Sequence, residues 1–212
     1  MSVIFVAELG SGHNKDESLM FELIRQAACS GADIAKVQFG WGWADTVRYI
    51  DPWAEQLDDW CDFFGIEFMA SIWSVGGLET ARSVKMLRYK IAHQKEDDEE
   101  LVKEILLDGK PTFISSDKWQ GDNIFPLFCP REYPSYPGME MPRWFDKFYG
   151  YSDHSHGIAA CLTAVARGAR YVEKHMTLDK TQDNTRDHGF SATPDEFSEM
   201  VRIGRSMSRL TC

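Results

Sequence analysis

The chain has 212 residues and a formal net charge of −10, with 43% hydrophobic and 26% charged residues. This composition is typical of a globular protein with a sizeable core, and the negative charge argues against a nucleic-acid or anionic-membrane surface. No apolar run reaches the roughly 20 residues that a membrane span needs, and the start, MSVIFVAELG, lacks the basic region of a signal peptide. The five cysteines form no CxxC pair, so we expect reduced thiols and a cytoplasmic location.

Taken in chain order, short apolar runs alternate with helix-type patterns. Glycine follows four of these helix patterns directly, where its left-handed conformation can end a helix: Gly31, Gly65, Gly109 and Gly168. The apolar runs predict eight strands, at residues 3–9, 34–39, 67–73, 86–93, 111–116, 124–130, 148–154 and 171–177. Strands that alternate with helices indicate parallel βαβ units.

Eight such units predict an α/β fold, a compact (β/α)₈ barrel formed by residues 1–212 as a single domain. The chain is short for this fold, which typically has roughly 250 residues. Part of the missing length lies after the fifth strand, where SDKWQGDN (116–123) is too short for a normal helix. The last helix is predicted to begin at TPDE (193–196), with Thr193 as its cap and Glu196 completing a capping box.

Function in such a barrel lies at the C-terminal ends of the strands, and the period of two along each strand indicates which residues share its inward face. Polar residues on these faces are Glu8, Lys36, Gln38, Arg88, Lys90, Ser115, Arg131, Ser152, His154, Glu173 and His175. Lysine and arginine outnumber glutamate in this set. We therefore expect a positively charged pocket in an acidic protein, which suits a phosphate or carboxylate ligand.

All six histidines fall at predicted strand ends or in the loops just beyond them: His13, His93, His154, His156, His175 and His188. A lone histidine is often a hydrogen-bonded core or surface residue, but six on one rim favour an active site. His154 and His175 end neighbouring strands, so their rings could meet at one divalent metal ion. Two imidazoles with open positions suit Mn²⁺ first, with Mg²⁺ or Co²⁺ as alternatives. Without a metal ion, the pair would serve as acid–base groups.

The segment GYSDHSHGIAACLTAVARGARYVEKHMTLDK (150–180) resembles the last two barrel strands of the N-acetylneuraminate (sialic acid) synthase family. In this family YSDH is paired with EKHxTLD. Further segments resemble the family in the same order: AELGSGHN (7–14), GADIAKVQF (31–39), GIEFMAS (65–71), YKIA (89–92), GKPTFISS (109–116), EYP (132–134) and DHGFSATPDE (187–196). The resemblance runs from end to end of the chain and covers the family's barrel. The family's C-terminal antifreeze-like domain has no counterpart in these residues.

The resemblance implies a transferase that condenses phosphoenolpyruvate with an N-acetylated aldose, N-acetylmannosamine or a related sugar, to give a nonulosonic acid and phosphate. It assigns the metal to His154 and His175, and proton handling or the orientation of water to Glu8. The positions that match the phosphoenolpyruvate contacts are Lys36, Lys90, Ser115 and Ser152, and those that match the sugar contacts are Gln38, Tyr133 and Asp187. A separate antifreeze-like domain protein is an expected partner. The aromatic loops at 41–43 and 133–144 predict either a lid over the rim or the contact of a homodimer.

Besides Lys15, which stands where family members usually have glycine, three positions depart from the family pattern. Gly12 stands where family members usually have asparagine. His93 replaces a serine that is expected to contact the phosphate. Arg131 replaces a small polar residue, and its guanidinium can either bind the phosphate in a bidentate manner or block the site.

Three functions stay open on the sequence alone. The first is the synthase reaction, which accounts for the whole retained set of acidic, basic and imidazole groups. The second is a degenerate barrel that binds phosphoenolpyruvate or a sugar without turnover, which the short chain and the three departures favour. The third is an aldolase or hydrolase on the same barrel. For Lys36 and Glu8 taken alone, the alternative is a buried ion pair that supports the barrel.

Overall fold

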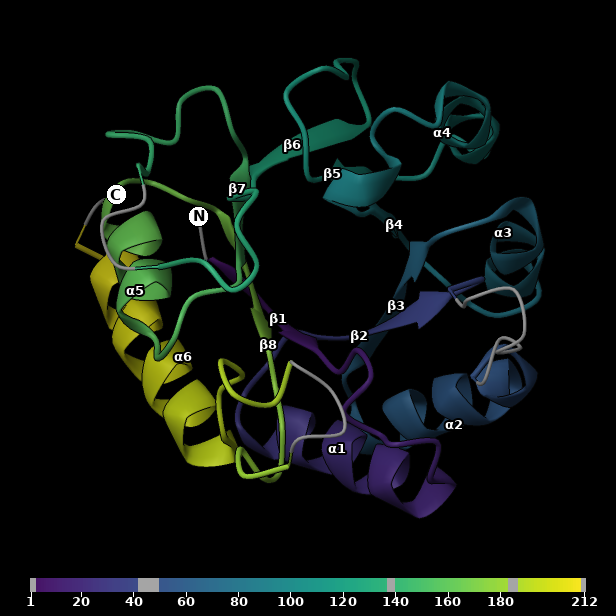
Figure 1. The fold of residues 1–212 in the computed structure, drawn as a ribbon, viewed down its shortest axis with the longest axis horizontal. Coiled ribbons are helices and arrows are strands. Elements are labelled where there is room, and N and C mark those ends of the chain that lie inside the picture. Colours follow the sequence, from purple (N-terminus) through teal and green to yellow (C-terminus); the bar gives the residue numbers. More distant parts are fainter. Residues whose placement is uncertain (1–2, 42–49, 137–139, 183–186, 211–212) are drawn as a thin grey trace.

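Eight parallel strands close into a barrel in sequence order in this computed structural model, as Figure 1 shows. The structure describes residues 3–41, 50–136, 140–182 and 187–210. The strands are β1 (Ile4–Glu8), β2 (Ile34–Phe39), β3 (Glu67–Ile72), β4 (Tyr89–Ile91), β5 (Thr112–Ile114), β6 (Ile124–Phe128), β7 (Gly150–Asp153) and β8 (Tyr171–His175). Each strand lies within its predicted range, which confirms the predicted barrel.

Six α-helices and two short 3₁₀ helices are present in the described part of the chain. They are α1 (Glu17–Cys29), η1 (Asp51–Trp53), α2 (Ala54–Phe64), α3 (Val75–Arg82), η2 (His93–Lys95), α4 (Glu99–Leu106), α5 (Ala159–Ala166) and α6 (Pro194–Ser208). The predicted end signals act as expected. Gly65 ends α2 with a φ of 68°, a conformation in which other residues are strained. At α6, Thr193 and Glu196 form the predicted capping box.

In the described part of the chain, two connections of the barrel contain no helix. Residues 115–123, between β5 and β6, contain none, as the sequence predicts. Between β6 and β7, the described residues 129–136 and 140–149 contain none either, which the sequence pattern does not predict. Figure 1 accordingly shows loops, and no helix, outside β6. Partly buried apolar side chains such as Trp119 and Phe148 pack against the core in these connections.

Two apolar clusters support the barrel. The larger one fills the space between the strands and the surrounding helices. The smaller one lies on inward-facing positions and comprises Val6, Ile34, Met69, Phe113, Leu127 and Tyr171. In it the rings of Phe113 and Tyr171 stack with their centres 4.4 Å apart, a contact that adds about 0.5–1.5 kcal/mol to the burial itself. Apolar side chains therefore fill the base of the barrel.

Arg88 does not belong to the polar inward rim where the sequence pattern placed it. It directly precedes β4 and forms a bidentate ion pair with Glu67, with 2.6 Å between Nε and Oε1. Its guanidinium carbon also lies 5.9 Å from the centre of the Phe113 ring. Arg88 stands two residues before Lys90, one layer nearer the N-terminal end of the barrel. Alternation along a strand indicates which face a residue such as Arg88 occupies, but it does not indicate the height of that residue along the barrel axis.

No helix in the described residues is long and apolar enough to cross a membrane.

Candidate active site

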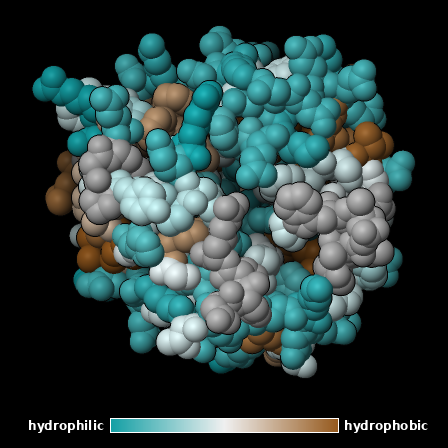
Figure 2. All heavy atoms as spheres, in the orientation of Figure 1, coloured by the Kyte–Doolittle hydropathy of each residue, from teal (hydrophilic) through white to brown (hydrophobic). Residues whose placement is uncertain are grey.

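A cavity of about 910 Å³ lies at the C-terminal ends of the strands. In Figure 2, hydrophilic residues surround a hollow near the centre of the face shown. All eleven residues predicted for the site line the cavity: Glu8, Lys36, Gln38, Lys90, Ser115, Arg131, Tyr133, Ser152, His154, His175 and Asp187. The structure thus brings the whole predicted set together. What each residue does there stays a prediction.

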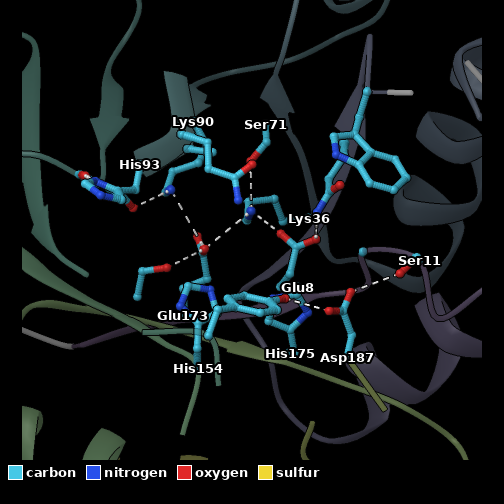
Figure 3. A pocket seen from close by; sticks show the side chains of 18 of the residues that line it. Glu8, Ser11, Lys36, Ser71, Lys90, His93, His154, Glu173, His175 and Asp187 are labelled. Carbon is cyan, nitrogen blue, oxygen red and sulfur yellow. Dashed lines mark hydrogen bonds and ion pairs between the residues drawn. The ribbon is translucent and has the colours of Figure 1, made fainter. Parts of the chain in front are cut away.

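The floor of the cavity holds two lysines and two glutamates that are almost fully buried (Figure 3). Lys36 forms an ion pair with Glu8, and its Nζ lies 3.4 Å from Oε1 of Glu173. The Nζ of Lys90 lies 3.9 Å from the same oxygen. The buried ion pair between Lys36 and Glu8, which the sequence left open as an alternative to a role in binding, is therefore present. It forms part of the cavity floor.

Hydroxyl groups complete the hydrogen bonding of this floor. Lys36 donates to Ser71 Oγ at 2.9 Å and Lys90 donates to Ser115 Oγ at 2.8 Å. Ser152 donates to Glu173 Oε1 at 2.9 Å. Lys36, Lys90 and Glu173 thus each have a hydroxyl partner, and an arriving anion can share or replace the hydroxyls that the two lysines contact.

The predicted site set omits two residues of this network. Ser71 ends the motif GIEFMAS on the same face of β3 as Met69, so the period of two could have found it. Glu173 was placed on the inward face without a role. In the structure it accepts hydrogen bonds from Ser152 and from Tyr171, whose hydroxyl lies 2.7 Å from Oε2.

Burial and charge act in opposition on these floor groups. Burial lowers the pKa of Lys36, but the charges of Glu173 and Glu8 outweigh it and raise that pKa above its usual value. For Lys90 burial prevails, and its pKa is lowered even though Glu173 opposes the change. Burial raises the pKa of Glu173, but Lys36 and Lys90 more than reverse this and hold it well below its usual value. Glu173 is therefore a carboxylate shared by both lysines.

The cavity as a whole carries a small excess of positive charge among its described lining residues. Its cations are Lys15, Lys36, Lys90 and Arg131, and its acids are Glu8, Glu173 and Asp187. The prediction of a positive pocket in an acidic chain therefore holds after Arg88 is removed from the set. The excess is smaller than the sequence pattern indicates because Arg88 lies outside the cavity, while Lys15 and Asp187 both line it.

The imidazoles of His154 and His175 lie next to each other, with ring centres 5.5 Å apart. Burial, and then the neighbouring His175, lower the pKa of His154 to about 3, so this ring is neutral near pH 7. The Tyr133 ring packs 4.6 Å from the His154 ring, and its hydroxyl lies 3.4 Å from Nε2 of His175. The two rings, predicted from strand order alone, do meet.

The donor set around these rings fits a metal ion that keeps open positions. Neutral imidazole is the form that binds metal ions, and the rings of His154 and His175 line the same cavity. Among the described residues, no third histidine, cysteine, aspartate or glutamate joins them in a cluster able to hold an ion. An ion held here would take its remaining ligands from water or a bound substrate.

Four of the six histidines line the cavity: His13, His93, His154 and His175. The other two correct the prediction of a complete rim. His156 is exposed, and His188 is 1% exposed with its Nδ1 2.6 Å from the hydroxyl oxygen of Thr177. Loops beyond a strand end can turn away from the barrel axis, so a position after a strand does not by itself place a side chain in the cavity.

The three residues predicted for the sugar converge from separate elements. Gln38, on β2, donates to Glu8 Oε1 at 3.3 Å. Tyr133, after β6, donates to Asp187 Oδ1 at 2.6 Å, and Ser11 donates to the other oxygen at 2.9 Å. Of the aromatic loops predicted near the rim, residues 42–43 and 137–139 lie outside the described residues.

A family model described as "NeuB family" matches residues 44–124 and 121–211. The chain belongs to the NeuB family. This NeuB-family chain is 26% identical over 251 residues to the N-acetylneuraminate-9-phosphate synthase of Homo sapiens, covering 96% of this chain and 70% of the human one. It is 27% identical over 248 residues to a pseudaminic acid synthase of Campylobacter jejuni, covering 94% of this chain and 72% of the other.

A crystal structure of N-acetylneuraminic acid (sialic acid) synthetase from Leptospira borgpetersenii, in complex with citrate, has the same fold. Its TM-score is 0.85 at 22% identity, and the match covers 100% of this chain and 85% of that one. Family membership confirms the resemblance to sialic acid synthases. It also confirms that this NeuB-family chain is an enzyme of the synthase class.

Proposed function

We propose that this NeuB-family enzyme condenses phosphoenolpyruvate with an N-acetylated aldose, N-acetylmannosamine or a related sugar, to give a nonulosonic acid and phosphate. The observation that carries the proposal is the cavity floor, where the buried Lys36 and Lys90 share one cavity with the imidazoles of His154 and His175. Two buried cations in a cavity favour a compact polyanion, and the paired imidazoles favour a polar acceptor.

The floor residues would hold phosphoenolpyruvate through its phosphate and carboxylate. Lys36 and Lys90 are positioned by hydroxyls and by Glu173, so their orientation is set before the ligand arrives. An arriving anion takes the hydroxyls of Ser115 and Ser152 as further donors. Pre-positioned groups of this kind lower the entropic cost of bringing reactants together, by up to about 7–11 kcal/mol in favourable cases.

The acceptor sugar would occupy the outer part of the cavity. Gln38, Tyr133 and Asp187 offer amide, hydroxyl and carboxylate groups for its hydroxyls and its N-acetyl group. His154 and His175 would hold a divalent metal ion, Mn²⁺ first, with Mg²⁺ or Co²⁺ as alternatives. When bound, such an ion polarises an aldehyde oxygen as a Lewis acid.

The reaction forms a bond between C3 of phosphoenolpyruvate and the aldehyde carbon of the sugar. The oxygen of a water molecule adds to C2, and one proton of that water passes to the carboxylate of Glu8 and then to the sugar oxygen. The bond between C2 and the phosphate oxygen breaks, and the remaining proton leaves with the phosphate. One phosphoenolpyruvate, one aldose and one water thus give one keto acid and one phosphate.

The experiment that tests this function measures phosphate release from phosphoenolpyruvate with Mn²⁺ and a panel of N-acetylated hexoses. The expected result is release that depends on the sugar and is matched by keto-acid formation. A control variant, Lys36→Met, should lose both. If phosphoenolpyruvate binds but no sugar releases phosphate under any condition, the proposal is wrong and the chain is a binding barrel.

We propose the cytoplasm as the site of this reaction, since phosphoenolpyruvate is a metabolite of that compartment. A second copy of the chain, and a separate protein with an antifreeze-like domain, are the partners that we propose for the sugar end of the cavity.

A further inference from the structure

His93 lies at a point where the chain departs from its family pattern, and its ring is held in one orientation. It begins η2 directly after β4 and borders the cavity near Lys90 (Figure 3). Its Nδ1 lies 3.2 Å from the carbonyl oxygen of Ser115 and 3.3 Å from Oε1 of Glu96. A carbonyl oxygen can only accept, so Nδ1 must carry a hydrogen. Nε2 is then the ring nitrogen that a ligand can reach, and no described residue bonds to it.

Ser115 connects His93 to the lysine floor. The hydroxyl of Ser115 accepts a hydrogen bond from Lys90 Nζ at 2.8 Å, and its backbone carbonyl accepts from His93. An anion held by Lys90 and Ser115 therefore lies beside the imidazole. The side chain of His93 is 27% exposed, which leaves room for that contact.

We infer that His93 binds the phosphate group of phosphoenolpyruvate through Nε2 as an imidazolium, and that Glu96 is the positioning residue that favours this charged form. This inference rests on the proposed function. A neutral ring with its hydrogen on Nδ1 presents only a lone pair to a phosphate oxygen, which also has lone pairs. Only the imidazolium has a second N–H to donate. Binding therefore takes up a proton from the solvent wherever His93 is neutral in the free protein.

Charged groups face His93 from several elements. The Glu96 side chain is 8% exposed and lies against Nδ1, and Lys118, in the connection after β5, lies 3.6 Å from the same carboxylate. The acids Glu96 and Asp97 favour the imidazolium, and the cations oppose it; these cations are Lys90, Lys118 and Arg131. A bound phosphate dianion would add to the negative charge around the ring and so favour the imidazolium.

The test is titration calorimetry of the whole chain with phosphoenolpyruvate at pH 7.5, in two buffers that differ in ionisation enthalpy. The difference between the two heats counts the protons taken up. We expect net proton uptake in the native chain. In His93→Ser and His93→Gln the ligand should still bind through the lysines, with less proton uptake. The affinity of the native chain for phosphoenolpyruvate should fall between pH 6.5 and 8.5. The His93→Gln variant keeps a donor that does not titrate, so its affinity should stay constant over this range.

Glu96→Gln should weaken binding about tenfold at pH 7.5, the factor that corresponds to about 1.4 kcal/mol, and much less at pH 6. The matched control is Glu100→Gln, an exposed glutamate on α4, which should match the native chain at both pH values. Equal proton uptake in the native chain and both His93 variants would overturn the inference and leave the proposed function intact. Absence of phosphoenolpyruvate binding to the native chain would overturn the proposed function and the inference with it.

Discussion

Asp153 and Lys174 lie directly opposite each other on β7 and β8, and their fully buried side chains form an ion pair with 2.6 Å between Oδ2 and Nζ. Each of the two residues directly precedes a cavity histidine, His154 or His175. Asp153 also accepts a hydrogen bond from Ser155 Oγ at 2.7 Å. The pair therefore ties together the two strand ends that carry the imidazoles.

Removing one partner of this pair should destabilise the fold strongly. We expect Lys174→Met to lower the free energy of unfolding by about 3–5 kcal/mol, because it leaves the Asp153 carboxylate buried without a cation. The double variant Asp153→Asn/Lys174→Met should lose less than the sum of the two single losses. Urea unfolding of the native chain and the three variants measures this coupling. Strictly additive losses would show that the two charges do not stabilise each other.

His154 and His175 are expected to bind one divalent ion jointly. Calorimetric titration with Mn²⁺ should show one tight site in the native chain and little binding in His154→Ala or His175→Ala. His156→Ala, which removes an exposed histidine outside the cavity, is the matched control and should bind like the native chain. Unchanged affinity in both cavity variants would remove the metal proposal.

Buried His154 should make the fold sensitive to mild acid. Its pKa is lowered from 6.5 to about 3 by burial and by the neighbouring His175, so the unfolded chain takes up this proton first as the pH falls. The stability that depends on neutral His154 is complete above pH 6.5 and is lost as the pH falls toward 3.

From pH 7.5 to 5.5 this loss amounts to about 1.4 kcal/mol. Urea unfolding with a chelator present measures this loss. In His154→Gln the free energy of unfolding should fall less between these two pH values, by about that amount, and in His156→Gln it should fall as in the native chain. An unchanged slope in His154→Gln would contradict a neutral buried ring.

Lys90 should contribute more to phosphoenolpyruvate binding than a surface lysine does. Lys90→Met removes a cation that is 2% exposed, and charge-assisted hydrogen bonds contribute about 1.5–3 kcal/mol each. We expect a loss of affinity of about tenfold or more, against no loss for Lys103→Met, whose side chain is 65% exposed on α4. Arg131→Ala should weaken binding comparably. Tighter binding in that variant would show that Arg131 obstructs the site.

These 212 residues assayed alone should accept several N-acetylated aldoses weakly. The family resemblance places one sugar-contacting arginine on the antifreeze-like domain, and loss of that contact and of water exclusion could lower the rate about a hundredfold or more. The measurement is the rate of keto-acid formation from N-acetylmannosamine and its 6-deoxy relatives, with and without an added antifreeze-like domain. Fast turnover of a single sugar by the chain alone would contradict the expectation.

The barrel itself could be predicted because its signals are local and repeated. Apolar runs, glycine stops and the capping box at Thr193 each depend on a few neighbouring residues, and they agree with one another along the chain. The rim positions followed from alternation along strands that end at one face. His154 and His175 are the best case, since adjacent strand ends must place them side by side.

The failures depend on features that alternation along one strand does not encode: height along the barrel axis, loop direction and contacts between strands. Arg88 shares a face with Lys90 but lies one layer lower, where Glu67 binds it. His188 follows a strand yet turns toward Thr177. The shared role of Glu173 depends on two lysines from other strands, and no pattern within one strand indicates that meeting.

The two connections without helices, on either side of β6, have a consequence for how the molecule opens. β6 is paired with β7 through only two residue pairs, Leu127–Gly150 and Phe128–Tyr151, and loops alone cover its outer side. Amide hydrogens of β5 and β6 should therefore exchange with solvent sooner than those of β1, β2 and β8, through local opening that leaves the rest of the barrel closed. Ser115 and Arg131 stand just beyond these two strands. A ligand held there would connect the ends of β5 and β6, and its binding should be visible as slower exchange at these two strands.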